Sequence, residues 1–198
     1  MIKYQICVSG AASGPTVTAS HQLAFDLGKE IAKAGHTLLT GATVGLPHYA
    51  ALGARKAKGL SIGFSPASSL REHIYSYRLP TAEFDYINFT GMEYVGRDVH
   101  LVRSSDAVIT VSGRMGSLHE FSTAAESGKI CGVLLGSGGL ADFIPILTKQ
   151  IKTPHASEII YDTDPVRLVA QVIVALDKKY GDIELNDDMA HDGSNRAG

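Results

Sequence analysis

The sequence lacks several features that would assign it to a functional class. Its 18 Lys and Arg residues nearly balance its 20 Asp and Glu residues, and the net charge of -2 gives no electrostatic reason to expect nucleic-acid binding. No apolar segment approaches the ~20 residues that a membrane-spanning helix needs. No cationic stretch followed by an apolar run opens the chain. We therefore predict no nucleic-acid partner, no membrane partner and no secretory signal.

Cysteine and metal-binding patterns are also scarce. The two cysteines, Cys7 and Cys131, each lie in an apolar segment, which is typical of buried free thiols and favours a reducing, cytoplasmic environment. The eight histidines show no ligand spacing, so we predict no metal site. We also predict no resident cofactor. A Walker-type phosphate loop is absent, because Thr123 stands where that motif would need a glycine before Gly128 and Lys129.

The sequence does contain strand-like and helix-like segments that alternate along almost its whole length. Short apolar runs predict buried strands at residues 4–9, 36–40, 60–64, 85–89, 107–111, 130–135 and 158–161. Helical spacing and stop signals predict intervening helices, such as those over 46–58 and 92–104. Repeated strand–helix units predict an α/β fold: a doubly wound, mostly parallel, Rossmann-like sheet with helices on both faces.

The length and the local composition suggest how the chain is organised. We predict a single domain over residues 1–180, long enough to bury one large core. Residues 66–85 form the least regular stretch, which we interpret as a mobile flap over the site. Residues 181–198 are polar and poor in large apolar groups, so we predict a disordered tail.

Three glycine-containing turns predict where a ligand binds. They lie at residues 9–14, 41–45 and 112–117, each directly after a predicted strand. In a doubly wound sheet such turns share the edge at which ligands bind, and glycine lets the backbone approach a ligand closely. The helix predicted to start near Ser117 points its free N–H groups into the same crevice. We expect a phosphate there, with Glu120 and Arg97 as charged neighbours.

These segments resemble the Lonely Guy family of nucleoside monophosphate phosphoribohydrolases. They are at least as similar to the molybdenum-cofactor carrier branch of the same Rossmann-like superfamily. Residues 9–14 resemble the family's C-G-S-S-x-G loop, and residues 40–46 resemble its G-G-G-x-x-G-L turn. Arg97 and residues 112–120 resemble its arginine and its P-G-G-x-G-T-x-x-E motif, with the family's separation of 120 − 97 = 23 residues. The resemblance covers roughly residues 4–150.

The resemblance implies a function and a set of site residues. It implies cleavage of the N-glycosidic bond of a nucleoside 5′-monophosphate, with Glu120 activating water or stabilising the sugar cation and Arg97 holding the substrate. It further implies a homodimer, for which the helix over 92–104 is the candidate interface. The residues expected to bind the phosphate or nucleotide are Ser9, Gly10, Ser13, Gly14, Gly41, Thr43, Gly45, Gly113, Arg114, Gly116 and Ser117.

The chain departs from the family pattern at several of these positions. Arg114 replaces the second glycine of a pair, Ala42 and Thr43 replace two glycines, and Asp98 stands where the family has a lysine. Our leading hypothesis is a phosphoribohydrolase-like enzyme that uses Glu120 and Arg97. These departures point toward the alternative, a non-catalytic carrier of a nucleotide-like or pterin (molybdenum) cofactor. A third possibility is a sensor in which ligand binding alters a partner contact.

Overall fold

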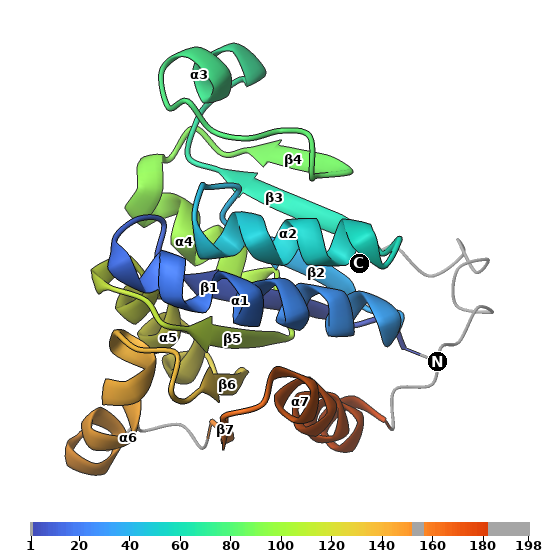
Figure 1. Cartoon of the computed structure of the whole chain (residues 1–198), viewed down its shortest axis with the longest axis vertical. Helices are drawn as coiled ribbons and strands as arrows, with labels where there is room; N and C mark the ends of the chain where they lie inside the picture. The colour runs from blue at the N-terminus through green and yellow to red at the C-terminus, as the bar shows by residue number, and fades with distance from the viewer. Residues whose placement is uncertain (1, 152–156, 182–198) are drawn as a thin grey trace, which may run out of the picture.

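The computed structural model describes residues 2–151 and 157–181, and a seven-stranded parallel sheet forms its centre (Figure 1). The strand order is β4-β3-β2-β1-β5-β6-β7, and every neighbouring pair is parallel. The strands are β1 (Gln5–Gly10), β2 (Thr37–Thr40), β3 (Ser61–Ser65), β4 (Tyr86–Phe89), β5 (Ala107–Val111), β6 (Ile130–Leu134) and β7 (Ile159–Asp162).

Helices cover both faces of the sheet. One layer contains α1 (Pro15–Lys33), α2 (Leu46–Lys56) and α7 (Pro165–Tyr180), and the other contains α4 (Glu93–Arg103), α5 (Met115–Glu126) and α6 (Leu140–Gln150). A short seventh helix, α3 (Leu70–Tyr75), lies beyond the β4 edge of the sheet (Figure 1). The predicted fold class, a doubly wound parallel sheet of Rossmann-like type, is confirmed.

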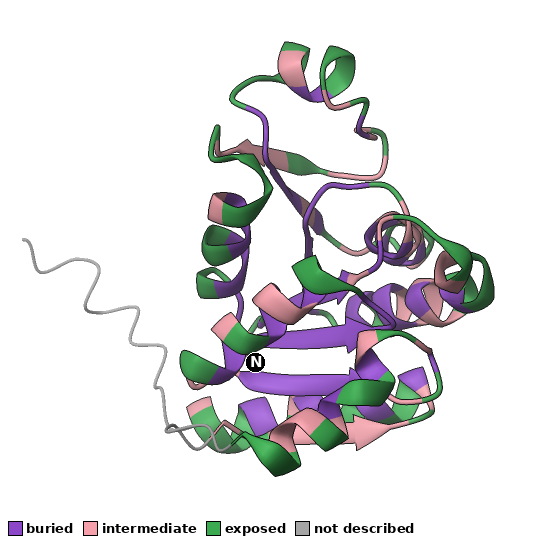
Figure 2. Ribbon diagram, turned by 90° about the vertical axis from the view of Figure 1, so that its left-hand side faces the viewer, coloured by how far each residue is buried: buried purple, intermediate pink, exposed green. Residues whose placement is uncertain are grey.

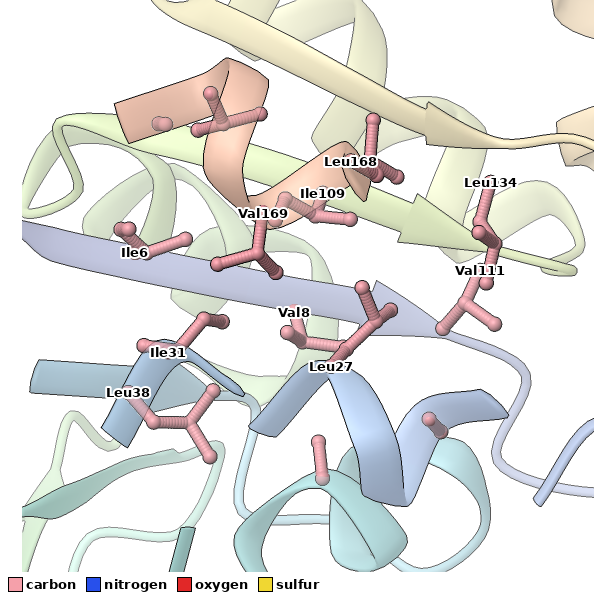
Figure 3. Packing of buried hydrophobic residues seen from close by; sticks show 14 of the residues in the cluster. Ile6, Val8, Leu27, Ile31, Leu38, Ile109, Val111, Leu134, Leu168 and Val169 are labelled. Atoms are coloured by element: carbon pink, nitrogen blue, oxygen red, sulfur yellow. The ribbon is translucent and has the colours of Figure 1, made fainter. Parts of the chain in front are cut away.

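Strand alternation divides the apolar core into two clusters. Ile6 and Val8 of β1 pack against α1 and α7, together with Leu27 and Ile31, which lie one helical turn apart on α1 (Figure 3). Cys7 lies between them in the strand and faces the opposite layer, among side chains of α4, α5 and α6. The central strands are therefore buried on both sides, as the purple colour of the sheet shows in Figure 2.

The two thiols are part of this core. Cys7 and Cys131 are free and buried, as the sequence predicts. Burial raises the pKa of the Cys131 thiol to about 12 and that of the Cys7 thiol well above its usual range. Both residues therefore act as small apolar side chains rather than as nucleophiles.

Two local expectations need correction. Helix α5 begins at Met115, two residues before the predicted start near Ser117. The stretch 66–85 contains the six-residue helix α3, which Ser69 caps by accepting a hydrogen bond from the Glu72 amide. The predicted tail, apart from Gly181, lies outside the described residues. In the described part of the chain, no helix combines the length and the apolarity needed to cross a membrane.

Candidate functional site

The site lies where the strand order reverses. The central strands β1 and β5 are paired along their length, but the chain leaves β1 toward β2, β3 and β4, and leaves β5 toward β6 and β7. The loops that follow them therefore separate and open a crevice at the carboxyl edge of the sheet. A hollow of about 180 Å³ lies there, lined by Val8, Ser9, Gly10, Ala11, Ala12, Gly41, Thr43, Pro47, Tyr94, Arg97, Asp98, Arg114, Gly116, Ser117 and Glu120.

The structure brings together most of the residues that the sequence nominates. Those lining the hollow are Ser9, Gly10, Gly41, Thr43, Arg97, Arg114, Gly116, Ser117 and Glu120. Those not lining it are Ser13, Gly14, Gly45 and Gly113. None of residues 66–85 lines it either.

Gly45 instead joins two loops beneath the site. It has φ 78°, and a Cβ at this position would lie 2.5 Å from the carbonyl oxygens of both Ala11 and Ala12. The next residue, Leu46, donates its amide to the Ala11 carbonyl at 2.9 Å. The loop after β1 therefore stabilises the N-terminus of α2, and only glycine allows this approach.

Gly113 has a corresponding role on the other side. Ser112 and Gly113 have φ values of 52° and 102°, and their carbonyls accept hydrogen bonds from Ala141 and Leu140 at 2.9 and 3.0 Å. These bonds satisfy two of the free amides at the start of α6. The turn after β5 therefore positions α6, and on this side the residues that line the hollow are Arg114, Gly116 and Ser117, which follow the turn.

The N-terminus of α5 and Arg114 form the cationic side of the hollow. The N-cap residue Arg114 makes no side-chain hydrogen bond to the first-turn amides, and the first intrahelical bond runs from the Leu118 amide to the Arg114 carbonyl at 2.9 Å. Gly116 and Ser117, in that first turn, line the hollow. The Arg114 guanidinium donates to Ser13 Oγ at 2.9 Å, linking α5 to the loop after β1. Helix amides and a guanidinium together suit a phosphate.

The floor of the hollow carries Glu120. Its carboxyl group is buried and accepts a hydrogen bond from the Ser9 hydroxyl at Oε2. Burial, and next the negative charge of Asp98, raise the pKa of Glu120 to about 7, while Arg97 and the Ser9 hydroxyl oppose this shift. Glu120 is therefore partly protonated at neutral pH.

Arg97 and Asp98 lie beside Glu120 and contact one another. Arg97 Nη1 donates to the Phe64 carbonyl at 3.0 Å, and its Nε lies 3.1 Å from Asp98 Oδ1, an ion pair without hydrogen-bond geometry at Nε. The other carboxylate oxygen of Asp98 lies 3.1 Å from His119 Nδ1. The Arg97 guanidinium is thus held in place by two protein groups, the Phe64 carbonyl and the Asp98 carboxylate.

Asp98 and Tyr94 are not among the site residues predicted from the sequence, although both line the hollow. The four-residue spacing along α4 is the sequence signal that could have identified them. Leu101 and Val102 are buried, and the residues four positions earlier are Arg97 and Asp98, so all four share one face of α4. Tyr94 lies one further turn back from Asp98.

Among residues 2–151 and 157–181, no group of three His, Cys, Asp or Glu side chains is placed to hold a metal ion.

Comparison with known proteins assigns the family. The sequence profile of the SLOG cluster4 family matches residues 3–169. The chain belongs to this family. A relative from Archaeoglobus fulgidus, described only as an uncharacterized protein, is 32% identical over 126 residues, which cover 63% of this SLOG chain and 76% of the relative.

Two solved structures are similar to this SLOG protein over nearly their full length. The molybdenum cofactor binding protein from the phototrophic bacterium Rippkaea orientalis has 27% identity and a TM-score of 0.70, covering 89% of this chain and 98% of that one. The molybdenum cofactor carrier protein from Chlamydomonas reinhardtii has 27% identity and a TM-score of 0.72, covering 88% and 99%. These matches confirm the resemblance to the Lonely Guy and carrier superfamily.

Proposed function

We propose that this SLOG protein binds a phosphorylated, pterin-type cofactor of the molybdenum-cofactor class and holds it without cleaving it. Two relatives of nearly equal length are named for binding or carrying that cofactor. The observation that carries the proposal is the joint presence of Arg114 and the free N-terminus of α5 on one wall of the hollow. That wall suits the phosphate of such a ligand.

The floor of the hollow suits the ring system of the same ligand. Glu120 and Asp98 offer carboxyl oxygens, and Ser9 offers a hydroxyl, close to the carboxyl edge of β1. A pterin presents several N–H donors and carbonyl or ring-nitrogen acceptors along one edge, which such groups can pair.

The state of the two charged residues favours binding over hydrolysis. A carboxylate stabilises an oxocarbenium-like transition state through its negative charge, and burial together with Asp98 keeps the pKa of Glu120 near 7. Arg97, the other expected catalytic residue, has its guanidinium engaged by the Phe64 carbonyl and by Asp98.

The test is direct retention of the cofactor. Molybdenum cofactor released from a purified molybdoenzyme is mixed with the protein under anaerobic conditions, followed by gel filtration and measurement of molybdenum and pterin fluorescence. We expect both to elute with the protein, and less of both with Arg114→Ala. Elution of all molybdenum and pterin in the small-molecule fractions would contradict the proposal.

A second candidate is the phosphoribohydrolase activity, which the position of Glu120 beside Arg97 in the hollow favours. Incubation with AMP, GMP, CMP and UMP and chromatography for free base tests it. Release of base by the parent protein and its loss in Glu120→Ala would make the protein an enzyme. The carrier proposal requires that no base is released.

The homodimer belongs to the same proposal. The outer face of α4 exposes Val95 and Val99, next to the helix face that carries Arg97 into the site. Pairing of two copies through this face would bury these side chains. Sedimentation at micromolar concentration tests the homodimer, since a clean monomer would count against it.

A cytoplasmic location is likewise proposed, on the basis of the two free thiols.

A further inference from the structure

Two carboxyl groups meet at the floor of the hollow. Asp98 comes from α4 and Glu120 from α5, both line the same small hollow, and the negative charge of Asp98 helps to raise the pKa of Glu120. Both residues are buried, at 4% and 7% exposure. Two carboxylates buried at the same small hollow do not both remain ionised, because neither charge is solvated and the two repel each other; such a pair retains one proton.

The neighbours of the pair determine which carboxyl group carries that proton. Asp98 has an oxygen 3.1 Å from Arg97 Nε and the other oxygen 3.1 Å from His119 Nδ1, so two nitrogen groups stabilise its negative charge. Glu120, in contrast, accepts a hydrogen bond from the hydroxyl of Ser9 on β1, which is a neutral group. The negative charge therefore stays on Asp98 and the proton on Glu120.

The remaining titratable groups near Glu120 do not reverse this assignment. The Cys7 thiol of β1 lies in the core with its own pKa well above the usual range, so it stays neutral. Arg97 favours ionisation of Glu120, but less strongly than burial and Asp98 oppose it. Arg114 lines the same hollow and donates to Ser13 at its mouth.

We infer that Asp98 is a positioning residue that holds a proton on Glu120, so that an anionic ligand meets one negative charge at the floor of the hollow instead of two. This inference rests on the proposed function, because it concerns how the same site accepts a phosphorylated ligand. It predicts that anion binding takes up a proton. His119, whose side chain is 36% exposed, links Asp98 to solvent and offers that proton a route.

The first test needs no ligand. The full chain, labelled with ¹³C at glutamate carboxyl carbons, is titrated by NMR, and Glu120→Gln identifies the signal. We expect the parent midpoint near pH 7. In Asp98→Asn, which keeps the shape of the side chain, the midpoint should fall by about 1 pH unit or more. Glu126→Gln, at an exposed position on the same helix, is the matched control and should leave the midpoint unchanged.

A Glu120 midpoint in the ordinary range for glutamate, or an equal midpoint in parent and Asp98→Asn, would overturn the inference.

The second test uses AMP as a stable phosphate monoester. Calorimetry at pH 7.5 in two buffers of different ionisation enthalpy measures the protons taken up on binding. We expect uptake by the parent and a reduced uptake by Asp98→Asn.

The two failures are distinguishable. Binding of AMP without proton uptake by the parent would overturn the inference and leave the proposed function standing. Failure of AMP, and of the molybdenum cofactor in the retention test, would count against the proposed function. The NMR titration would still decide the role of Asp98.

Discussion

The guanidinium of Arg97 lies in the space that a side chain on Gly41 would fill. A Cβ at position 41 would stand 1.8 Å from Arg97 Nη1, closer than any real contact allows. The same Nη1 donates to the Phe64 carbonyl. Gly41, at the end of β2, thus leaves room for an arginine of α4 to reach the carboxyl end of β3 beneath the site.

Gly41→Ala should therefore displace Arg97. The added methyl group forces the guanidinium to move, which weakens its bond to Phe64 and its ion pair with Asp98. We expect a loss of about 2 kcal/mol in the free energy of unfolding, typical of overpacking in a buried site. Denaturant unfolding measures it.

Gly116→Ala is the matched control for that experiment. A Cβ at Gly116 meets no atom within 4 Å, and the residue lies in the first turn of α5 with an ordinary helical φ. Its stability should equal that of the parent or slightly exceed it, since alanine favours helix. Equal stability of the parent and Gly41→Ala would contradict the close packing of Arg97 against the turn.

Much of the fold is predictable from local patterns. The run 107–111 coincides with β5, and the ends of the other strands are predicted to within one residue, because buried parallel strands are continuous apolar runs between turn signals. The sequence patterns do not predict helix α3. It has only six residues, but its start has the Ser69-x-x-Glu72 spacing of a helix N-terminus, a signal that could have located it.

The site is predictable in its location but not in its details. Strand ends and glycine turns indicate the crevice, yet the direction of each turn depends on backbone dihedrals. Ser112 and Gly113 have positive φ and point their carbonyls at α6, so Gly113 supports a helix rather than lining the hollow. Likewise, only the packed structure shows that Asp98 and Glu120 are buried at the same hollow.

Arg114 provides a test of the anion site. Its guanidinium lines the hollow and donates to Ser13, at the exposed mouth. Arg114→Ala should weaken retention of the phosphorylated ligand by about tenfold, the loss of one charge-assisted hydrogen bond, and leave the unfolding midpoint nearly unchanged. Arg71→Ala on α3 is the control, since Arg71 is exposed, stacks on Tyr75 and does not line the hollow. Equal ligand retention by both variants would exclude Arg114 from the site.

Glu120 makes the stability of the protein depend on pH. Its folded-state pKa, about 7, lies above the ordinary glutamate value of 4.5, so the folded protein holds a proton that the unfolded chain has released between these values. Its contribution is fully present below about pH 4.5 and is lost as the pH rises to about 7, by at most about 3 kcal/mol. Glu120→Gln, which remains neutral, should lack this decline. Denaturant unfolding from pH 4.5 to 7.5 compares the two, and parallel curves would refute the assignment.

His73 fixes the segment that contains α3. The ring is fully buried, its Nε2 lies 2.9 Å from the Pro80 carbonyl, and its Nδ1 lies 2.8 Å from Ser65 Oγ. Because a carbonyl only accepts, Nε2 carries the proton and donates, while Nδ1 accepts from the Ser65 hydroxyl. One side chain thus links α3 to the end of β3 and to the chain that returns toward β4.

His73→Ala should therefore loosen this segment selectively. The change leaves a cavity and two unpaired polar groups, a loss of about 2 kcal/mol or more if the segment stays in place. Opening of residues 66–85 avoids that cost, so hydrogen exchange should accelerate there while the amides of β1 and β5 keep their protection. His100→Ala, at an exposed position on α4, should change neither region. Exchange across 66–85 as fast in the parent as in His73→Ala would show that the histidine does not hold the segment.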